Sequence, residues 1–162
     1  SYPALTVPDD NSYIRFMTGA YETNVEITGH IVAHVNVSVT PELTGGTPKD
    51  IDIFVTVRHW AADGSEVFYT GSIGDPVPVS KGWQRVSLRK VNKEHPNHRE
   101  YRPWRDYFST DVQPVIPGEI YGLDVEVWPT QIVLQKGEKL SFEISGGDTQ
   151  GVGIFSHESP ER

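Results

Sequence analysis

The chain has 162 residues, of which 36% are hydrophobic, so it predicts one domain with its own core rather than a membrane protein or a disordered tail. Its formal net charge of −8 argues against nucleic acid as a partner, because an acidic surface repels phosphate backbones. The sequence has no cysteine, which removes disulfides, thiol catalysis and cysteine-based zinc sites. We expect a soluble protein, either cytoplasmic or secreted.

Alternation of apolar and polar side chains dominates the chain from residue 13 onward. A period of two indicates an extended strand with one buried face and one solvated face. With 15 Gly and 12 Pro, the chain has many turns and little room for helix. We therefore predict an all-β, antiparallel β-sandwich of about eight strands, of the jelly-roll or Greek-key type. The predicted strands lie at residues 13–17, 25–39, 51–60, 67–70, 84–91, 121–127, 132–134, 140–145 and 152–155.

Several residues mark where these strands bend or end. Gly29 interrupts the apolar side of the longest strand and predicts a bulge or a bend. Asp63-Gly64 predicts a hairpin turn, because the pair tolerates the positive φ that such turns need. Pro129 is expected to stop the strand that begins at Tyr121. Val86 and Leu88 are expected to face inward from the strand at residues 84–91.

Domain boundaries follow from the same reading. We expect residues 1–12 to be a lead-in arm, residues 13–156 a single β-sandwich domain, and residues 157–162 a tail. Because the chain begins at Ser1 without an initiator methionine, we expect it to be a piece of a longer protein.

No arrangement of residues predicts a catalytic centre. A serine nucleophile of the hydrolase type needs Gly-x-Ser-x-Gly between a strand and a helix, and the nearest segment, residues 71–74, has no helix after it. His95 and His98 have a metal-like spacing, but Pro96 lies between them and no third ligand is apparent, so we interpret them as solvated loop histidines. We assign no catalytic and no metal-binding residue.

We expect no cofactor, although a calcium ion stays open as an alternative. Asp9, Asp10 and Asn11 supply clustered oxygens that, together with Asp148, are of the kind a hard cation prefers. The competing interpretation is ordinary turn chemistry, which also favours aspartate and asparagine.

Residues 92–110 follow no period and combine aromatic, histidine, proline and charged residues. Segments of this length without regular structure are usually functional or pinned to a surface. Trp83 and Trp104 are expected in loops with several arginines nearby, and aromatic and arginine side chains together are typical of contact surfaces. Trp60 and Trp128 are expected to pack at strand ends. The candidate binding or interface residues are Trp83, Arg85, Arg89, Tyr101, Trp104 and Tyr107.

Four segments in order resemble the C-terminal domain of the X-Pro dipeptidyl-peptidase family. Residues 82–89 (Gly-Trp-Gln-Arg-Val-Ser-Leu-Arg) resemble its Gly-Trp-x-Arg-x-Ser-x-Arg strand. Residues 117–130 resemble its Pro-Gly-Glu … Pro-Thr segment, and residues 137–145 its Gly-x-basic-Leu-x-Leu-x-Ile-Ser strand. Residues 25–29 are similar to its opening Glu-Ile-x-Gly strand. Together they cover about residues 13–148.

This resemblance implies a galactose-binding-like jelly-roll that follows an α/β-hydrolase domain in hydrolases of the cocaine-esterase-like (CocE/NonD) type. In that family the Ser-Asp-His triad lies in the hydrolase domain, and none of its residues matches a position here. The implied role is non-catalytic: packing on the catalytic domain and helping to shape its substrate pocket, through the strand of Trp83 and Arg85 and the loop around Trp104. The alternatives are a free-standing carbohydrate-binding module that uses loop tryptophans and a structural interaction domain without a ligand.

Overall fold

The computed structural model describes residues 13–40 and 49–148. The predicted arm, the strand at residues 152–155 and the tail lie outside the described residues. In the described part, no helix is long and apolar enough to cross a membrane. The elements are β1 Tyr13–Met17, β2 Val25–Ser38, β3 Asp52–Trp60, β4 Glu66–Val67, β5 Tyr69–Thr70, β6 Pro76–Val77, β7 Ser80–Arg85, η1 Val86–Leu88, η2 Ser109–Asp111, β8 Ile120–Leu134 and β9 Lys139–Ser145.

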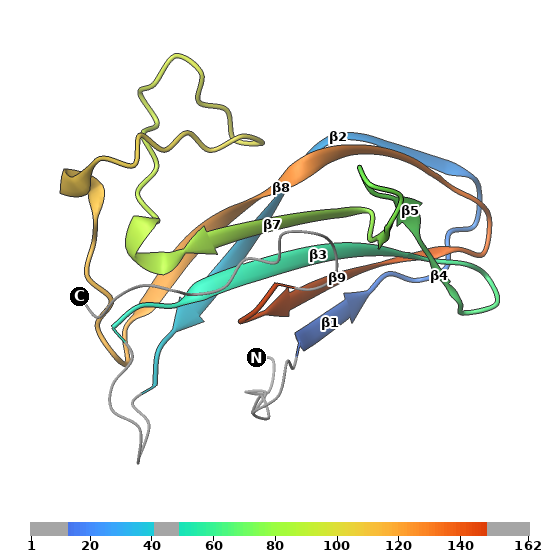
Figure 1. Ribbon diagram of the computed structural model, residues 1–162, viewed down its shortest axis with the longest axis horizontal. Helices are drawn as coiled ribbons and strands as arrows, with labels where there is room; N and C mark the ends of the chain where they lie inside the picture. The colour runs from blue at the N-terminus through green and yellow to red at the C-terminus, as the bar shows by residue number, and fades with distance from the viewer. Residues whose placement is uncertain (1–12, 41–48, 149–162) are drawn as a thin grey trace.

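The strands form a curled antiparallel sheet in the order β1-β9-β3-β7-β8-β2, with β4 beside β3 and a separate β5-β6 pair. Figure 1 shows β2 and β8 arching over the layer formed by β7, β3, β9 and β1. The two layers join where β7 meets β8, at the pair Gly82 and Val127. This arrangement confirms the all-β antiparallel sandwich, with nine strands among the described residues.

One apolar core lies on the inner face of the curled sheet. Each long strand contributes alternate side chains to it, as the period of two requires. The core-facing side chains of β2 are only half-buried, whereas those in the middle of β3 and β8 are buried. The buried hydrophobic residues are Val39, Phe54, Val55, Val57, Val86, Val115, Leu123, Val125, Val127, Ile132, Leu134 and Leu140.

The expected end of a strand at Pro129 is wrong, because β8 continues through it to Leu134. The register between β2 and β8 shifts there: Gly29 pairs with Thr130, but Ile31 pairs with Val127. Two residues of β8 therefore oppose one residue of β2, which is a β-bulge. A proline fits at a bulge because no ladder hydrogen bond is required of it. The bulge expected at Gly29 is confirmed, and Gly29 has a φ of 117°.

The strand expected at residues 84–91 is also wrong. The extended chain ends at Arg85 and turns into η1. Gln84 is buried, and its side-chain amide donates to the carbonyl of Leu88 at 2.9 Å. The Ser87 hydroxyl and backbone N–H both donate to Asp50, so Ser87 faces inward rather than outward. Side-chain hydrogen bonds of this kind offer the backbone an alternative to the sheet ladder.

The strand expected at residues 67–70 is divided between two partners. β4 returns along β3 after the Asp63-Gly64 turn, as expected. β5 instead pairs with β6, and the segment at residues 71–74 forms the turn between them, closed by a hydrogen bond from the Gly74 N–H to the Gly71 carbonyl at 3.1 Å. No helix follows that turn, so the nearest match to a nucleophile motif lacks the required setting.

Candidate functional site

Trp104 organises the long irregular segment at residues 92–110, which we call the aromatic loop. The Asn92 N–H donates to the Trp104 carbonyl at 2.8 Å and closes the base of the loop. The His95 ring stacks on the Trp104 indole with 4.0 Å between ring centroids. The backbone N–H of Trp104 donates to His98 Nδ1 at 3.2 Å. The sequence predicts the two histidines to be solvated. Both are instead half-buried against Trp104.

Asp106 holds the other side of Trp104. Its carboxylate accepts from the Trp104 indole N–H at 2.8 Å and from the Asn92 amide at 2.7 Å. These two hydrogen bonds, the Asn92 one first, lower the pKa of Asp106 below its ordinary 3.8. The loop is thus an ordered structure with its own polar framework.

We expect this framework to respond to acid in a defined pH range. Because the pKa of Asp106 is lower in the folded state, its contribution to loop order is complete above the ordinary value of 3.8 and is lost as pH falls through the folded-state pKa. The Trp104 indole N–H resonance in a nitrogen–proton spectrum should shift with a midpoint below 3.8. Asp106→Asn should abolish the transition, and a midpoint at or above the ordinary value would contradict the assignment.

The aromatic loop is fastened to the outer face of the β2–β8 layer. Arg105 is buried, at 8% exposure, and its Nη2 donates to the Asp124 carbonyl at 2.6 Å. Burial lowers the pKa of Arg105, offset in part by Tyr107, Asp124 and Glu126. Tyr101 lies on the same face, with its ring centroid 5.6 Å from that of His30 on β2.

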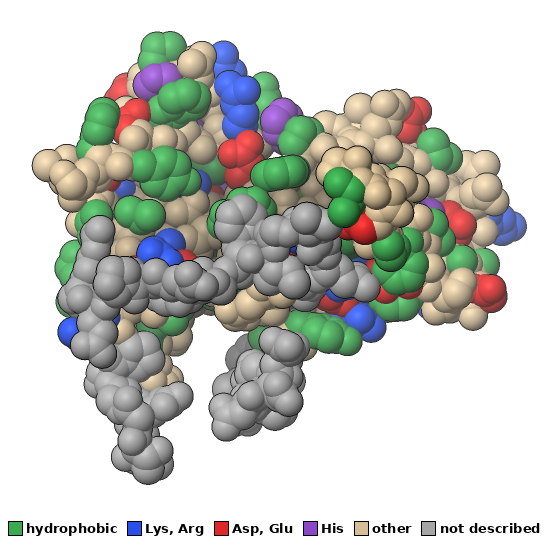
Figure 2. Space-filling model, in the orientation of Figure 1, with side chains coloured by type: hydrophobic (Ala, Val, Ile, Leu, Met, Phe, Trp, Pro, Cys, Tyr) green, Lys and Arg blue, Asp and Glu red, His purple; other side chains and the backbone are tan. Residues whose placement is uncertain are grey.

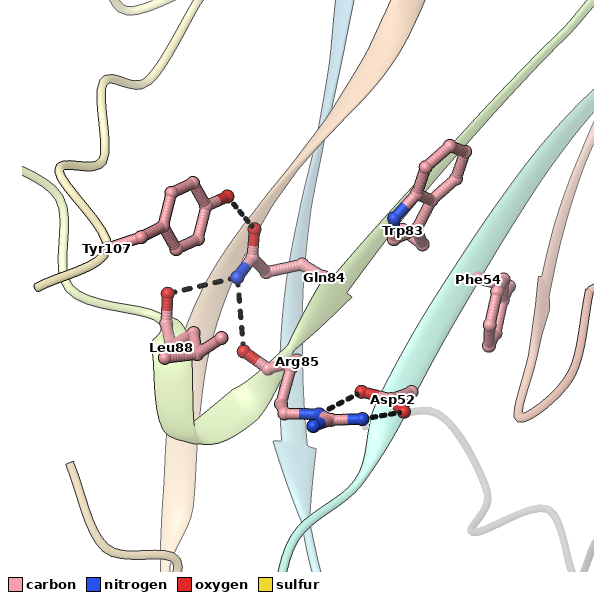
Figure 3. A pocket seen from close by; sticks show the side chains of 7 residues that line it. All are labelled: Asp52, Phe54, Trp83, Gln84, Arg85, Leu88 and Tyr107. Carbon is pink, nitrogen blue, oxygen red and sulfur yellow. Dashed lines mark hydrogen bonds and ion pairs between the residues drawn. The ribbon is translucent and has the colours of Figure 1, made fainter. Parts of the chain in front are cut away.

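A pocket of about 310 Å³ opens between β7, β3 and the aromatic loop. Figure 3 shows Tyr107 from the loop facing Gln84, and Trp83, Phe54 and Arg85 arranged along the two strands. The Tyr107 hydroxyl donates to Gln84 Oε1 at 3.3 Å. The lining residues are Asp52, Phe54, Trp83, Gln84, Arg85, Leu88 and Tyr107.

Strand pairing explains the position of Arg85. Asp52 pairs with Arg85 in the β3–β7 register, so both side chains emerge on the same face. Arg85 donates from Nε and Nη2 to the two Asp52 oxygens at 2.8 and 2.9 Å. The hydrogen bond to Asp52 raises the pKa of Arg85 despite partial burial. Such a two-point ion pair fixes the guanidinium plane beside the pocket.

Arg89 has a structural position instead. Its guanidinium lies 4.2 Å above the centroid of the Tyr121 ring, a cation–π contact. Its Nη1 donates to the carbonyls of Val86 at 3.0 Å and Gln113 at 3.2 Å, and its Nη2 to that of Pro114 at 3.3 Å. Arg89 therefore ties η1 to the chain that leads into β8 and does not line the pocket.

Two of the four tryptophans contact each other, whereas Trp60 and Trp104 have separate environments. Trp83 lies in β7, so its expected place in a loop is wrong. Its ring centroid is 5.7 Å from that of Trp128, which lies at the bulge of β8 and is 62% exposed. Trp60 is half-buried and donates to the Ser141 hydroxyl at 2.8 Å.

Of the six residues expected at the site, Trp83, Arg85 and Tyr107 line the pocket, while Tyr101 and Trp104 belong to the aromatic loop outside it. The sequence reasoning missed Phe54, Asp52 and Gln84. The first two could have been found by pairing the predicted strands in register, since Phe54 lies opposite Trp83 and Asp52 opposite Arg85.

The oxygen cluster considered for calcium is only partly described. Asp9, Asp10 and Asn11 lie outside the described residues, and Asp148 accepts from Lys81 Nζ at 2.9 Å. Within residues 13–40 and 49–148, no group of three or more His, Asp or Glu side chains is placed to hold a metal ion. The expectation of no cofactor, with calcium as the open alternative, is therefore not tested.

The fold and the site together define a β-sandwich domain with exposed aromatic rings beside a pocket that Arg85 helps to line. The model of the X-Pro dipeptidyl-peptidase C-terminal non-catalytic domain matches residues 2–161, so the chain belongs to that family. The family expected from the four sequence segments is thereby confirmed.

Known relatives are much longer than this chain. Proteins predicted to be serine esterases from Mycobacterium bovis and Mycobacterium tuberculosis are each 24% identical over 149 residues, which is 90% of this chain and 20% of the relative. A CocE/NonD family hydrolase from Staphylococcus aureus has the same fold, with a TM-score of 0.78 and 20% identity over 93% of this chain and 27% of that one. An alpha-amino acid ester hydrolase matches with a TM-score of 0.52 and 13% identity, over 82% of this chain and 18% of that one. The chain thus spans about a fifth of the curated relatives.

Proposed function

We propose that this chain is the accessory β-sandwich of an α/β-hydrolase of the X-Pro dipeptidyl-peptidase or acyl-esterase type. In this proposal it packs on the catalytic domain and helps to shape the substrate pocket there. The family match and the small share of the relatives that the chain covers support the proposal. Its chemistry would then be supplied by the remaining part of the polypeptide.

The observation that carries the proposal is an ordered loop with exposed rings. Tyr101, Tyr107 and Phe108 are 55%, 57% and 63% exposed, although the backbone that bears them is held by Trp104, Arg105 and Asp106. Figure 2 shows hydrophobic side chains among charged ones in the upper left of the molecule, where Figure 1 places this loop. Rigid exposed aromatic residues contribute strongly to protein interfaces because little conformational freedom is lost on binding.

The proposal predicts that the chain is inert alone and matters within the larger protein. The 162-residue chain should not hydrolyse an aryl ester or an Xaa-Pro anilide above the buffer rate. In the polypeptide that joins it to its hydrolase domain, Trp104→Ala should lower kcat/KM by about tenfold, because it removes the stacked centre of the loop. Phe68→Ala is the control, since Phe68 is another large aromatic residue, 45% exposed, but lies between β4 and β5, away from the loop.

Two outcomes would contradict the proposal. Turnover by the isolated chain that a serine-directed reagent abolishes would make it an enzyme in its own right. Unchanged kinetics for Trp104→Ala, with the loop disordered, would remove the loop from the mechanism.

A carbohydrate-binding module is the second candidate, and the Trp83–Trp128 pair is the observation that favours it. An exposed indole such as that of Trp128 presents a flat face of the kind on which sugar rings stack. Tryptophan fluorescence titrated with a panel of plant and fungal polysaccharides separates the two candidates. Saturable quenching that Trp128→Ala removes would favour the module, and a flat response would favour the accessory domain.

A further inference from the structure

Tyr107 has an unusual backbone conformation. Its φ is 56°, and among the described residues it is the only one other than glycine with a positive φ. This left-handed region is sterically unfavourable for a bulky aromatic residue. Such strain persists only when the surrounding structure imposes it, and it is concentrated at contact and functional sites.

Both sides of Tyr107 are held firmly. Before it, Arg105 is buried against β8, and the Asp106 carboxylate is bonded to Trp104 and Asn92. After it, the Phe108 N–H donates to Asp111 Oδ2 at 3.3 Å, and the Asp111 N–H donates back to the Phe108 carbonyl at 2.9 Å. The hydrogen bonds on the two sides fix the direction of the chain before and after Tyr107. The backbone changes direction at Tyr107, which therefore adopts the positive φ.

This geometry presents the Tyr107 ring rather than burying it. The side chain is 57% exposed at the edge of the pocket; its hydroxyl has a long hydrogen bond to Gln84 Oε1, and Tyr107 also interacts with the Arg105 side chain. Phe108 beside it is 63% exposed. The folded chain therefore keeps a strained backbone although it buries less than half of either side chain.

Three charged groups around Tyr107 are already bonded within the chain, and a fourth, Arg105, is buried with its Nη2 donating to the Asp124 carbonyl. Arg85 forms its two-point ion pair with Asp52, and Lys90 binds Asp111. Asp106 accepts two hydrogen bonds from the loop. A partner at this surface would therefore meet aromatic rings and a phenol hydroxyl rather than unpaired charge, which fits a predominantly apolar protein surface.

We propose that Tyr107 is a preformed contact residue through which this chain binds the hydrolase domain of the same polypeptide. The inference rests on the proposed function, and the partner follows from the length of the relatives, of which this chain covers about a fifth. The strain is held in the free domain so that the ring is already in its bound orientation, which lowers the entropy lost on docking.

The proposal makes stability and docking change in opposite directions. Glycine adopts a positive φ at little cost, so Tyr107→Gly relieves the strain while it removes the ring. The urea midpoint of the 162-residue chain should rise or stay level. A tyrosine with only a structural role would instead lower that midpoint when replaced by glycine.

Docking is measured in the full polypeptide that carries both domains. Tyr107→Gly should lower kcat/KM for an aryl ester by about tenfold, the scale of losing an interface hot spot. In hydrogen exchange, the amides of residues 107–111 should be more protected in the full polypeptide than in the isolated chain, and Tyr107→Gly should abolish the difference. Tyr107→Phe keeps the ring and should retain most of both effects, and Phe68→Ala serves as the surface control.

The outcomes distinguish this inference from the proposed function. If the hydrolase works equally well with the whole accessory domain deleted, the proposed function fails. If deletion abolishes activity but Tyr107→Gly leaves kinetics and protection unchanged, only the inference about Tyr107 fails. A lowered urea midpoint for Tyr107→Gly would likewise overturn the preformed-strain argument.

Discussion

Gly82→Ala should destabilise the chain by about 3 kcal/mol, at the upper end of the cost of overpacking a filled site. At Gly82 the β7 and β8 backbones approach each other so closely that an added Cβ would lie 2.1 Å from the Glu126 carbonyl oxygen and 2.8 Å from Val127 Cα. Both atoms belong to the backbone, so they cannot move aside by a change of rotamer. Relief requires the two layers to separate at the residue pair where β7 meets β8.

The measurement is urea unfolding followed by far-ultraviolet circular dichroism, with a drop in melting temperature of about 10 °C as the second readout. Gly122→Ala is the matched control. Gly122 lies in β8, the strand that Gly82 approaches, but the nearest atom to a Cβ added there is Asn36 Oδ1 at 3.8 Å. We expect that control to change stability by less than about 0.5 kcal/mol. Equal stability of the two variants would mean that β7 and β8 can move apart at Gly82 without cost, and would contradict the prediction.

This close approach gives the Gly-Trp-x-Arg segment a physical explanation. Gly82 admits the neighbouring strand, Trp83 faces Trp128, and Arg85 holds Asp52 beside the pocket. One six-residue strand, Ser80–Arg85, therefore makes all three of these contacts. The sequence identified the segment by resemblance, but only strand pairing shows why a glycine is needed there.

The strands themselves were predictable because alternation is a local property. β1, β2 and β3 lie close to where the period of two placed them, and the bulge at Gly29 was recognised from a single interruption. The continuation through Pro129 was not predictable in this way. A bulge is a relation between two strands, and the partner of Pro129 is a residue about a hundred positions earlier in the chain.

The site was predictable only in part, for a related reason. Trp83, Arg85 and Tyr107 were selected by residue type, and the structure brings them to one pocket. Phe54 and Gln84 were not, because their contribution depends on register and on a side chain that bonds to the backbone of η1. The strain at Tyr107 has no sequence signature, since no glycine or asparagine marks the position.

Alternation also does not say which face of a strand is wet. In β9 the polar residues Ser141 and Glu143 alternate with apolar ones and look solvated in the sequence, yet they are 0% and 2% exposed. Glu143 accepts from Arg15 Nε at 2.6 Å and from Arg58 Nε at 2.7 Å. Arg58 in turn donates to Glu66 at 2.7 Å. The outer face of β3 and β9 is therefore a buried chain of alternating charges.

Breaking this chain at its centre should be costly. Glu143→Leu leaves Arg58, whose side chain is 9% exposed, with one carboxylate fewer in a place that water does not reach. Burial alone lowers the pKa of Arg58, and the hydrogen bonds to Glu143 and Glu66 raise it overall, so the guanidinium stays charged. The penalty should be about 3 kcal/mol, the lower end of the range for a broken buried pair, because Glu66 still binds Arg58.

A double substitution separates the net contribution of the Arg58–Glu143 pair to the free energy of unfolding from the cost of removing only one of its charges. Arg58→Met combined with Glu143→Leu removes both charges, and we expect it to recover part of the stability lost by Glu143→Leu, because well-packed apolar residues often replace a buried ion pair without loss. Recovery is incomplete because Glu66 then loses its ion pair with Arg58. Lys90→Met, which breaks the exposed Lys90–Asp111 pair, is the control and should cost less than about 1 kcal/mol. Equal losses in the single and double variants, measured by urea unfolding, would show that the chain of charges stabilises the fold by itself.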